Sequence, residues 1–572
     1  MLEILVLWII VFLITWLAGD LLFFAFDRGL KHELDKKGAT VKSIAGFFVL
    51  TVIAQYVSLF SPLNTNALKG IATVLMLLEV LRLKKHKWKG RRKEDKKTLR
   101  FIVTALKLLW LILILICCVN YDFNELHGDS DLYMAQSVKW AGEYGAVKGI
   151  ANFNPRIGFD SSLVCFYALS SLRAMAGGRI HAACGFLFVI FGWYGIEAVY
   201  GIMKEGFLVS KLFRLVMPGY AATTMHLSGA YTTDTVSNLA AGFFVAEWAA
   251  AAEAKEEGEE VYGLLAVAAV ICASMKLSLA MLVLAALLPG IRMLKKKKFK
   301  TVLLFLGMGV ACIVPYVLRT VILTGYLIFP MEKIDLFDFA WKVPSDMVCL
   351  EREMVELWAK APGTELENIR GGISGWINIW LENQRGSYGY MLVLANIAAL
   401  AGIVVMRLLM RKKEDKAPYM MILITALIAE GLYWFIEAPD YRFIQLLMFF
   451  LPVYLAFCIY KLLPKHFVTM ELIAVILFIA VFFSYHPKWI MNDNISFITR
   501  TAKSGELTQL AFEQPRLKEY EMKSIDWNGI SVQVPKSGML SGYATLPCTM
   551  YADYLDRLYL LGADISDGVG VK

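Results

Sequence analysis

The sequence predicts an all-α polytopic integral membrane protein, and three observations carry this prediction. Of the 572 residues, 58% are hydrophobic and only 19% are charged, whereas a soluble domain carries about 25% charged residues. The apolar residues are gathered in blocks of about 16–25 residues, the length that crosses the hydrocarbon core as a helix. The short alternating segments typical of a β-barrel are not the pattern here. The number of apolar blocks predicts about fourteen transmembrane helices.

The first apolar block, residues 2–26, is interpreted as a retained span. It has no basic start, it carries Glu3, and it runs long before any site that resembles a signal-peptidase cleavage site. A secretory signal peptide is therefore not expected.

Short basic connectors between the apolar blocks predict the orientation. The connector at 82–100 holds eleven Lys and Arg residues, and short cytoplasmic loops are rich in these two residues. Similar basic runs lie at 292–300, 411–416 and 461–465. The net charge of +9 thus belongs to topology signals, and no nucleic-acid partner is expected.

Three parts follow from this orientation. Residues 1–100 form an N-terminal three-span extension with a basic cytoplasmic loop, and residues 101–485 form the membrane core. The core carries extracytoplasmic loops at 120–158 and 319–386. The tail at 486–572 has Gly and Pro punctuation and short β-like runs, which predict a small ordered extracytoplasmic cap.

Three carboxylates are predicted on the extracytoplasmic side: Asp129 and Asp131 in the first loop, and Asp234 at the start of a later span. A carboxylate at the membrane surface can accept a proton from a hydroxyl nucleophile, and carboxylates close together can hold a hard divalent cation such as Mg²⁺ or Mn²⁺. The alternative for each site is helix capping, by Ser130 or Asp129 in the first case and by Thr233 or Asp234 in the second.

Three cations are more informative, because Lys276, Arg319 and Arg442 are expected at the outer face, against the positive-inside trend. Lys276 interrupts the apolar block at 261–291, which we interpret as two short helices that break near this lysine. An Arg side chain binds phosphate in a bidentate manner and Lys binds it as a point charge. The alternative is a local ion pair, for which Asp440 is the obvious partner of Arg442.

Two of the nine cysteines, Cys349 and Cys548, fall in polar extracytoplasmic segments. If oxidised, they would connect the second loop to the tail. No CxxC or His-rich tract is present, so a structural zinc site is not expected.

The run from Asp129 to Gly145, DSDLYMAQSVKWAGEYG, resembles the signature of a family of uncharacterised bacterial multispan membrane proteins. Further matching runs are spread over residues 100–570. They are 149–162, Lys276-Leu-Ser, 319–344, 438–443 and 546–549. This family is similar to the GT-C superfamily of lipid-linked sugar transferases.

The resemblance implies a GT-C-like fold in the bacterial inner membrane and a glycosyltransferase site that faces outside. The donor would be a polyprenyl-phosphate-linked sugar, and the acceptor a saccharide or glycolipid of the cell envelope. Asp129 matches the acid that activates the acceptor, and the motif around Asp234 resembles a second acidic motif. Asp129, Asp131 and Asp234 are assigned as the catalytic carboxylates. The donor phosphate is assigned to Lys276, Arg319 and Arg442, and the substrate cleft to Tyr133, Gln136, Arg156, Tyr326 and Asp440.

Two other functions stay open. A polysaccharide polymerase that joins lipid-linked repeats would also need outer-face cations, but with two lipid sites. A transporter of lipid-linked oligosaccharides would place charges along a central route and would show repeat symmetry, which this sequence lacks. A non-catalytic scaffold would tolerate loss of Asp129.

Overall fold

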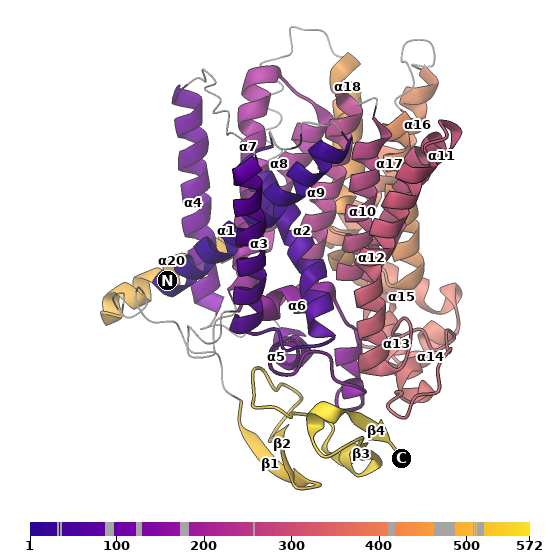
Figure 1. Ribbon diagram of the computed structural model, residues 1–572. Coiled ribbons are helices and arrows are strands. Elements are labelled where there is room, and N and C mark those ends of the chain that lie inside the picture. The colour runs from indigo at the N-terminus through magenta and orange to yellow at the C-terminus, as the bar shows by residue number, and fades with distance from the viewer. Residues whose placement is uncertain are drawn as a thin grey trace.

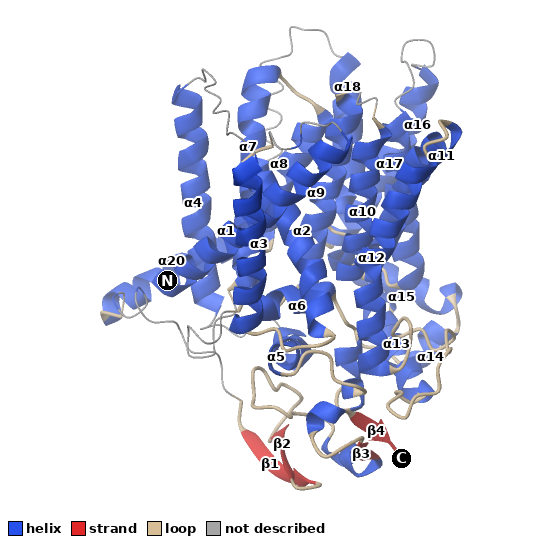
Figure 2. Cartoon of the chain, viewed as in Figure 1, coloured by secondary structure: helices blue, strands red, loops and turns tan. Residues whose placement is uncertain are grey.

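The computed structural model is a bundle of long helices with a small cap that contains short strands at one end (Figure 1; Figure 2). The residues described are 1–30, 34, 37–85, 97–121, 129–171, 182–254, 258–409, 418–462, 487–506, 508, 511 and 520–572. The predicted basic connectors at 86–96 and 411–416 lie outside the described residues.

Eight segments within the described part of the chain are long and apolar enough to cross a membrane. They are α1 (Leu2–Leu30), α2 (Ala39–Ser58), α4 (Lys97–Tyr121), α7 (Ala183–Glu205), η6 (Leu277–Ala286) with α11 (Leu287–Lys295), α12 (Phe299–Thr324), α16 (Tyr388–Leu409) and α17 (Pro418–Glu437). The prediction of an all-α membrane protein is therefore confirmed at the level of fold class.

Further helices complete the bundle and its connections. The longer ones are α3 (Thr65–Lys85), α8 (Val209–Thr223), α9 (Thr233–Glu253), α10 (Glu259–Met275), α13 (Ser345–Lys360), α15 (Ile373–Gln384), α18 (Phe450–Leu462) and α20 (Pro487–Ser504). The shorter ones are η2 (Ser130–Met134), α5 (Ala135–Glu143), η3 (Ile150–Asn152), η4 (Pro155–Gly158), α6 (Ser162–Leu169), η5 (Met225–Leu227), α14 (Leu366–Arg370), η7 (Tyr441–Phe443) and η8 (Leu447–Phe449).

The N-terminal helices pack into the same hydrophobic core as the rest of the bundle. Helices α1 and α2 touch closely at two glycines: a Cβ on Gly19 would lie 1.8 Å from the Lys42 carbonyl oxygen, and one on Gly46 would lie 1.7 Å from that of Thr15. Thr15 and Ser43 share a hydroxyl–hydroxyl hydrogen bond of 2.7 Å at this contact. Small residues allow such close helix approach within membranes, so α1 and α2 are an integral part of the bundle.

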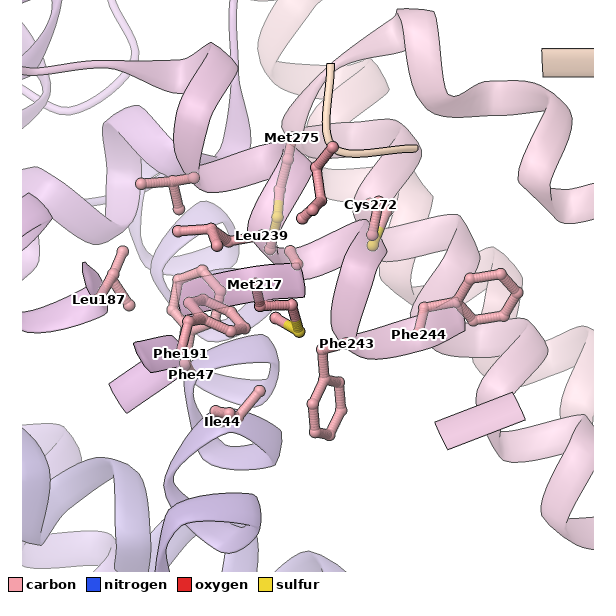
Figure 3. Packing of buried hydrophobic residues seen from close by; sticks show 14 of the residues in the cluster. Ile44, Phe47, Leu187, Phe191, Met217, Leu239, Phe243, Phe244, Cys272 and Met275 are labelled. Atoms are coloured by element: carbon pink, nitrogen blue, oxygen red, sulfur yellow. The ribbon is translucent and has the colours of Figure 1, made fainter. Parts of the chain in front are cut away.

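The centre of the bundle is formed by side chains from α2, α7, α8, α9 and α10 (Figure 3). Phe47 of α2 lies edge-on to Phe166 of α6, with ring centroids 4.9 Å apart, and to Phe191 of α7 at 6.1 Å. Edge-to-face aromatic pairs add to the dispersion energy of a packed core. This packing fixes α9 and α10, whose ends carry the candidate site.

Residues 520–572 form a small ordered cap, as predicted for the tail, whereas Pro487–Ser504 of the same tail forms helix α20, which contacts α4. Strands β1 (Met522–Trp527) and β2 (Ile530–Pro535) pair antiparallel, as do β3 (Leu558–Leu560) and β4 (Val569–Val571). Short helices η10 (Ala552–Arg557) and η11 (Ile565–Asp567) flank β3 and precede β4. Trp527 meets Phe153 edge-on at 5.1 Å, and the Thr549 hydroxyl donates to the Phe153 carbonyl at 2.6 Å. The cap is thereby seated on the first loop.

The two ends of the bundle differ in chemistry. Helix α11, which ends in the basic run at 292–298, and the end of α18 at Leu462 lie opposite the cap (Figure 1). Helices α13 and α14 and the cap lie together at the other end (Figure 1). The described basic residues of α11 and α18 thus lie at the end of the bundle opposite the cap.

Candidate functional site

The N-terminus of α9 presents Asp234 to Lys276. Thr232, and neither Thr233 nor Asp234 as expected, caps this helix by accepting a hydrogen bond from the Thr235 N–H at 3.4 Å. Three adjacent residues can cap a helix here, and the backbone selects the one with extended φ and ψ. The Asp234 carboxylate does not make the N-terminal cap of α9. Its Oδ1 instead accepts a hydrogen bond from the Lys276 ammonium.

Lys276 lies at the break between α10 and η6, as the sequence predicts. Its backbone is extended (φ −155°, ψ 123°) between Met275, the last residue of α10, and Leu277, the first of η6. The ten-residue 3-10 helix η6 is unusually long for this helix type, and such stretches often mark functional positions. The break directs the ammonium to the Phe443 ring, 3.8 Å from its centroid.

Arg442 approaches the same ring from the turn after α17. Its guanidinium carbon lies 6.0 Å from the Phe443 centroid. The predicted local ion pair is present: the Asp440 carboxylate accepts from Arg442 Nε at 2.8 Å and lies 2.7 Å from its second terminal nitrogen. The Arg442 side chain is nevertheless 50% exposed, so it is not sealed from solvent by its ion pair.

Asn238 fixes the relative position of these elements. It lies one turn into α9, is completely buried, and donates to the carbonyls of Asp234 at 2.9 Å, Arg442 at 3.2 Å and Phe443 at 3.0 Å. Its carboxamide oxygen accepts from the Leu446 N–H at 3.2 Å. Asn238 was not predicted as a site residue, although a polar side chain one turn after Asp234 in an apolar helix was a usable signal.

The first loop places Asp129 and Tyr133 within electrostatic range of Asp234 and Arg442. Tyr133 lies in the π-helical turn η2, a helix type often found at functional sites. Burial is the main cause that raises the pKa of the Tyr133 hydroxyl, and the negative charges of Asp129 and Asp234 add to it, while Arg156 and Arg442 oppose them. Four of the predicted site residues therefore lie within electrostatic range of Tyr133.

The same charges act on Arg442. Burial opposes its charged form, but the hydrogen bond and charge of Asp440, with the charges of Asp234 and Asp129, raise the pKa of the guanidinium above its ordinary value. Asp129 is partly exposed. A carboxylate that is within electrostatic range of Arg442 and open to solvent can receive a proton from an entering hydroxyl.

Ser130 connects η2 to the segment before α9. The expected cap at this helix is not made by Ser130 or Asp129, and the Ser130 hydroxyl instead accepts from the Tyr231 N–H at 2.8 Å. The bond joins segments that lie 101 residues apart. It holds Asp129 in register with Asp234.

Asp131 and Gln136 face the cap, away from the two cations. Asp131 Oδ2 accepts from the Tyr520 hydroxyl at 2.6 Å, and its carbonyl accepts from the Gly542 N–H at 2.7 Å. Gln136 is 1% exposed and donates to the Gly542 carbonyl at 2.9 Å. Their placement corrects the expectation that Asp131 is catalytic and that Gln136 lines the cleft, because both attach the cap to the first loop.

Arg319 has a different environment from Lys276 and Arg442. It is 2% exposed, and its Nε lies 3.0 Å from the carboxylate of Asp160, which is equally buried. The neighbouring Ser161 donates to the Met275 carbonyl at 2.6 Å, directly before Lys276. This placement corrects the expectation that Arg319 faces a phosphate on the same surface. Its guanidinium supports the backbone that positions Lys276.

Arg156 and Tyr326 lie at the margins of this cluster. Arg156 Nε is 3.9 Å from the Glu351 carboxylate of α13, and Tyr551 of the cap is hydrogen-bonded to the Arg156 side chain. Tyr326 was expected in the same cleft, but it lines a separate pocket beside the cap. The structure thus brings together Asp129, Tyr133, Asp234, Lys276 and Arg442, which we call the outer-face cluster.

The three carboxylates expected to bind a divalent ion do not form a common site. Asp131 is bonded to Tyr520 and Asp234 to Lys276, so the three carboxylates do not converge. Among the residues that the structure describes, no group of three or more His, Cys, Asp and Glu side chains has a metal-binding arrangement.

The hypothesised disulfide is not formed. Cys349 and Cys548 are both free thiols, and Cys349 Sγ accepts from Arg352 at 3.7 Å. Burial raises the pKa of the Cys548 thiol to about 11.

Comparison with known proteins gives one match. Residues 1–451 match the family described as "Domain of unknown function (DUF8201)". The chain belongs to this family. No curated protein and no solved structure matches the chain. The match includes every residue of the outer-face cluster and ends before the cap.

Proposed function

We propose that this chain is a membrane glycosyltransferase that transfers a sugar from a polyprenyl-phosphate donor to an acceptor hydroxyl on the extracytoplasmic face. The proposal includes a GT-C-like arrangement of about fourteen spans in the bacterial inner membrane. It assigns the protein to cell-envelope polysaccharide or glycolipid assembly. The observation that carries it is the convergence of Lys276 and Arg442 on Phe443 beside the carboxylates of Asp129 and Asp234.

The two cations suit a lipid phosphate. Lys276 sits between an apolar helix and an apolar 3-10 segment, where an isolated charge costs about 2.5–3.5 kcal/mol. Asp234 offsets this cost in the free protein. The exposed half of Arg442 adds planar donors. Together they would stabilise the charge that develops on the phosphate as it leaves, which is usually the largest contribution to such catalysis.

Asp129 would act as the general base. The acceptor oxygen attacks the anomeric carbon and forms the new glycosidic bond, while the bond from that carbon to the phosphate oxygen breaks. The phosphate leaves with the bonding electron pair, and the hydroxyl proton passes to the Asp129 carboxylate. A single displacement of this kind inverts the anomeric centre. The step is carried by these side chains, because the three carboxylates considered for a divalent ion form no metal-binding group among the described residues.

The other residues have supporting roles in this proposal. Asp234 holds Lys276, and Asn238 holds the turn that carries Arg442. Tyr133 and Arg156 line the acceptor side. Arg319 and Asp160 support the break at Lys276 through Ser161.

The test uses the full chain in nanodiscs with a panel of undecaprenyl-phosphate sugars and soluble acceptors. Wild type should bind a donor and release free lipid phosphate. Asp129→Asn should keep donor binding and reduce turnover by about 10²–10⁴-fold, the usual contribution of a general base. Asp553→Asn, the same chemical change on the exposed surface of the cap, is the matched control and should leave turnover unchanged. Unreduced turnover in Asp129→Asn would remove the base from the mechanism.

A transporter of lipid-linked oligosaccharides is the second candidate, and one observation favours it. Glu430 of α17 is completely buried and lies against the backbone of Met281 and Leu282 in η6. Buried acids beside interrupted helices are typical of transport routes. If wild type binds no donor in the panel, a flipping assay with a fluorescent lipid-linked oligosaccharide decides between the two.

A further inference from the structure

A second pocket lies between the connector from α12 to α13 and the β3–β4 part of the cap. It has a volume of about 310 Å³ and shares no residue with the outer-face cluster. We call it the cap pocket. Its lining includes Tyr326, Asp335, Asp338, Lys342, Ser345 and Tyr559. Ligand pockets usually span about 300–1,000 Å³, so this pocket suits a small ligand.

The lining is polar on several sides. Lys342 forms an ion pair with Asp335, which leaves the exposed Asp338 carboxylate and the Ser345 hydroxyl as further polar groups on the lining. The two carboxylates and one ammonium leave little net charge. Such a lining offers donors and acceptors to a neutral polyhydroxylated ligand and does not favour a polyanion or an acyl chain.

Tyr326 carries a buried hydroxyl at this pocket that lacks a hydrogen-bond partner within the described part of the chain. Its side chain is 1% exposed. The Lys342 ammonium lies over its ring, 5.2 Å from the centroid. Burial raises the pKa of the hydroxyl to about 12, so it remains a donor near neutral pH. A buried polar group without a bond is destabilising, and a ligand hydroxyl that enters beside Lys342 would satisfy it.

One aromatic ring on the pocket wall, Phe339, is held in a stack of three rings. Phe339 lines the pocket, lies parallel to Trp341 with centroids 4.3 Å apart, and stacks on Phe337 at 5.2 Å. The Tyr559 hydroxyl donates to the Ala340 carbonyl at 3.4 Å, which ties the stack to β3. Phe339, held by its stacked neighbours, offers apolar surface for the C–H groups of a ligand at low entropic cost.

From these features we propose that the cap pocket binds a neutral saccharide. Its polar groups fit sugar hydroxyls, and its Phe339 ring fits sugar C–H groups. Saccharide binding in this pocket does not depend on the proposed function. The further role of the saccharide as part of the acceptor chain rests on that function. Tyr559 and Val571 lie outside the family match, whereas the loop that carries Tyr326 lies inside it. The pocket lining therefore comes partly from the cap and partly from residues 1–451, which match the family.

The test measures saccharide binding without donor, by saturation-transfer difference NMR on the full chain in nanodiscs. The probes are maltotriose, chitotriose and xylotriose, with glucuronic acid as a charged comparison. At least one neutral probe should bind. Tyr326→Phe and Asp338→Asn should each weaken binding by about three- to tenfold, the effect of one hydrogen bond. Tyr554→Phe, in the cap but outside the pocket, is the matched control and should bind as wild type.

The outcomes separate this inference from the proposed function. Lys276→Met should bind the saccharide as wild type does, because Lys276 does not line the cap pocket. Saccharide binding that depends on Tyr326, with no turnover of any donor, would keep the pocket and reject the transferase. Absence of binding by every neutral probe, or equal binding by wild type, Tyr326→Phe and Asp338→Asn with unchanged thermal unfolding, would overturn the saccharide site.

Discussion

The Lys276 ammonium lies 3.8 Å from the centroid of the Phe443 ring, although the two residues belong to different parts of the bundle. A cation over an aromatic face is stabilised by about 0.5–2 kcal/mol. Because Arg442 reaches the same ring, a phosphate beside Phe443 would meet both cations.

Removal of either cation should weaken binding of undecaprenyl phosphate. A hydrogen bond to a charged group contributes about 1.5–3 kcal/mol, so we expect about 10- to 100-fold weaker binding for Lys276→Met and for Arg442→Ala. Titration into nanodiscs, read by native mass spectrometry, measures the loss. Lys523→Met, at an exposed position on β1, controls for net charge. Undiminished affinity in both site variants would place the phosphate elsewhere.

The buried Arg319–Asp160 pair should matter for stability more than any exposed pair. Loss of one partner leaves an uncompensated buried charge and costs about 3–5 kcal/mol, so Arg319→Ala should unfold far more easily. Replacement of both residues by Met and Leu should recover much of this loss. Arg370→Ala, which breaks a pair whose arginine is 55% exposed, should cost about 0–1 kcal/mol.

Chemical unfolding in detergent, followed by tryptophan fluorescence, measures these differences. If Arg319→Ala and Arg370→Ala reduce the free energy of unfolding equally, the buried pair does not have the assigned role.

Asn238 should position the site as well as stabilise it. Asn238→Leu removes the donor for the Asp234, Arg442 and Phe443 carbonyls, which we expect to cost about 1–3 kcal/mol and to weaken binding of undecaprenyl phosphate. A matched control exists in Asn396, whose carboxamide donates to the Leu392 carbonyl at 2.8 Å and to that of Met448 at 2.7 Å.

Asn396→Leu should lose similar stability without loss of affinity for the lipid phosphate. Thermal unfolding and the same titration separate the two effects. Equal affinity losses in both variants would mean that Asn238 acts only through stability.

The sequence predicted what depends on local pattern. Apolar blocks identified the helical membrane class, and the lysine within one block identified the break at Lys276. The ion pair of Asp440 with Arg442 was also predicted, because its partners lie two residues apart.

Partners far apart in the chain could not be predicted from one sequence. Asp131 meets Tyr520 across 389 residues, and Arg319 meets Asp160 across 159. A charge in a sequence shows that a partner is needed and does not show which one. The structure therefore gives Asp131 and Arg319 roles other than those expected. Lys276 and Arg442 lie together at Phe443, as their expected role in binding a phosphate requires.

Cys548 gives the cap a dependence on pH that can be measured. Burial raises the pKa of its thiol from 9.0 to about 11 on folding, so the unfolded chain loses this proton first as pH rises. The contribution of this thiol to the free energy of unfolding is therefore fully present below pH 9. It decreases between pH 9 and 11, with a slope of at most about 1.4 kcal/mol per pH unit. Cys548→Ala should remove that slope.

Peptide mapping after treatment with N-ethylmaleimide at pH 8 tests the same environment. Cys548 is 3% exposed and should stay unmodified until the cap unfolds, while the partly exposed Cys349 reacts and serves as the internal reference. Rapid labelling of Cys548 in the folded protein would contradict its burial. A Cys349–Cys548 cross-linked peptide from the native protein would show that the two thiols meet after all.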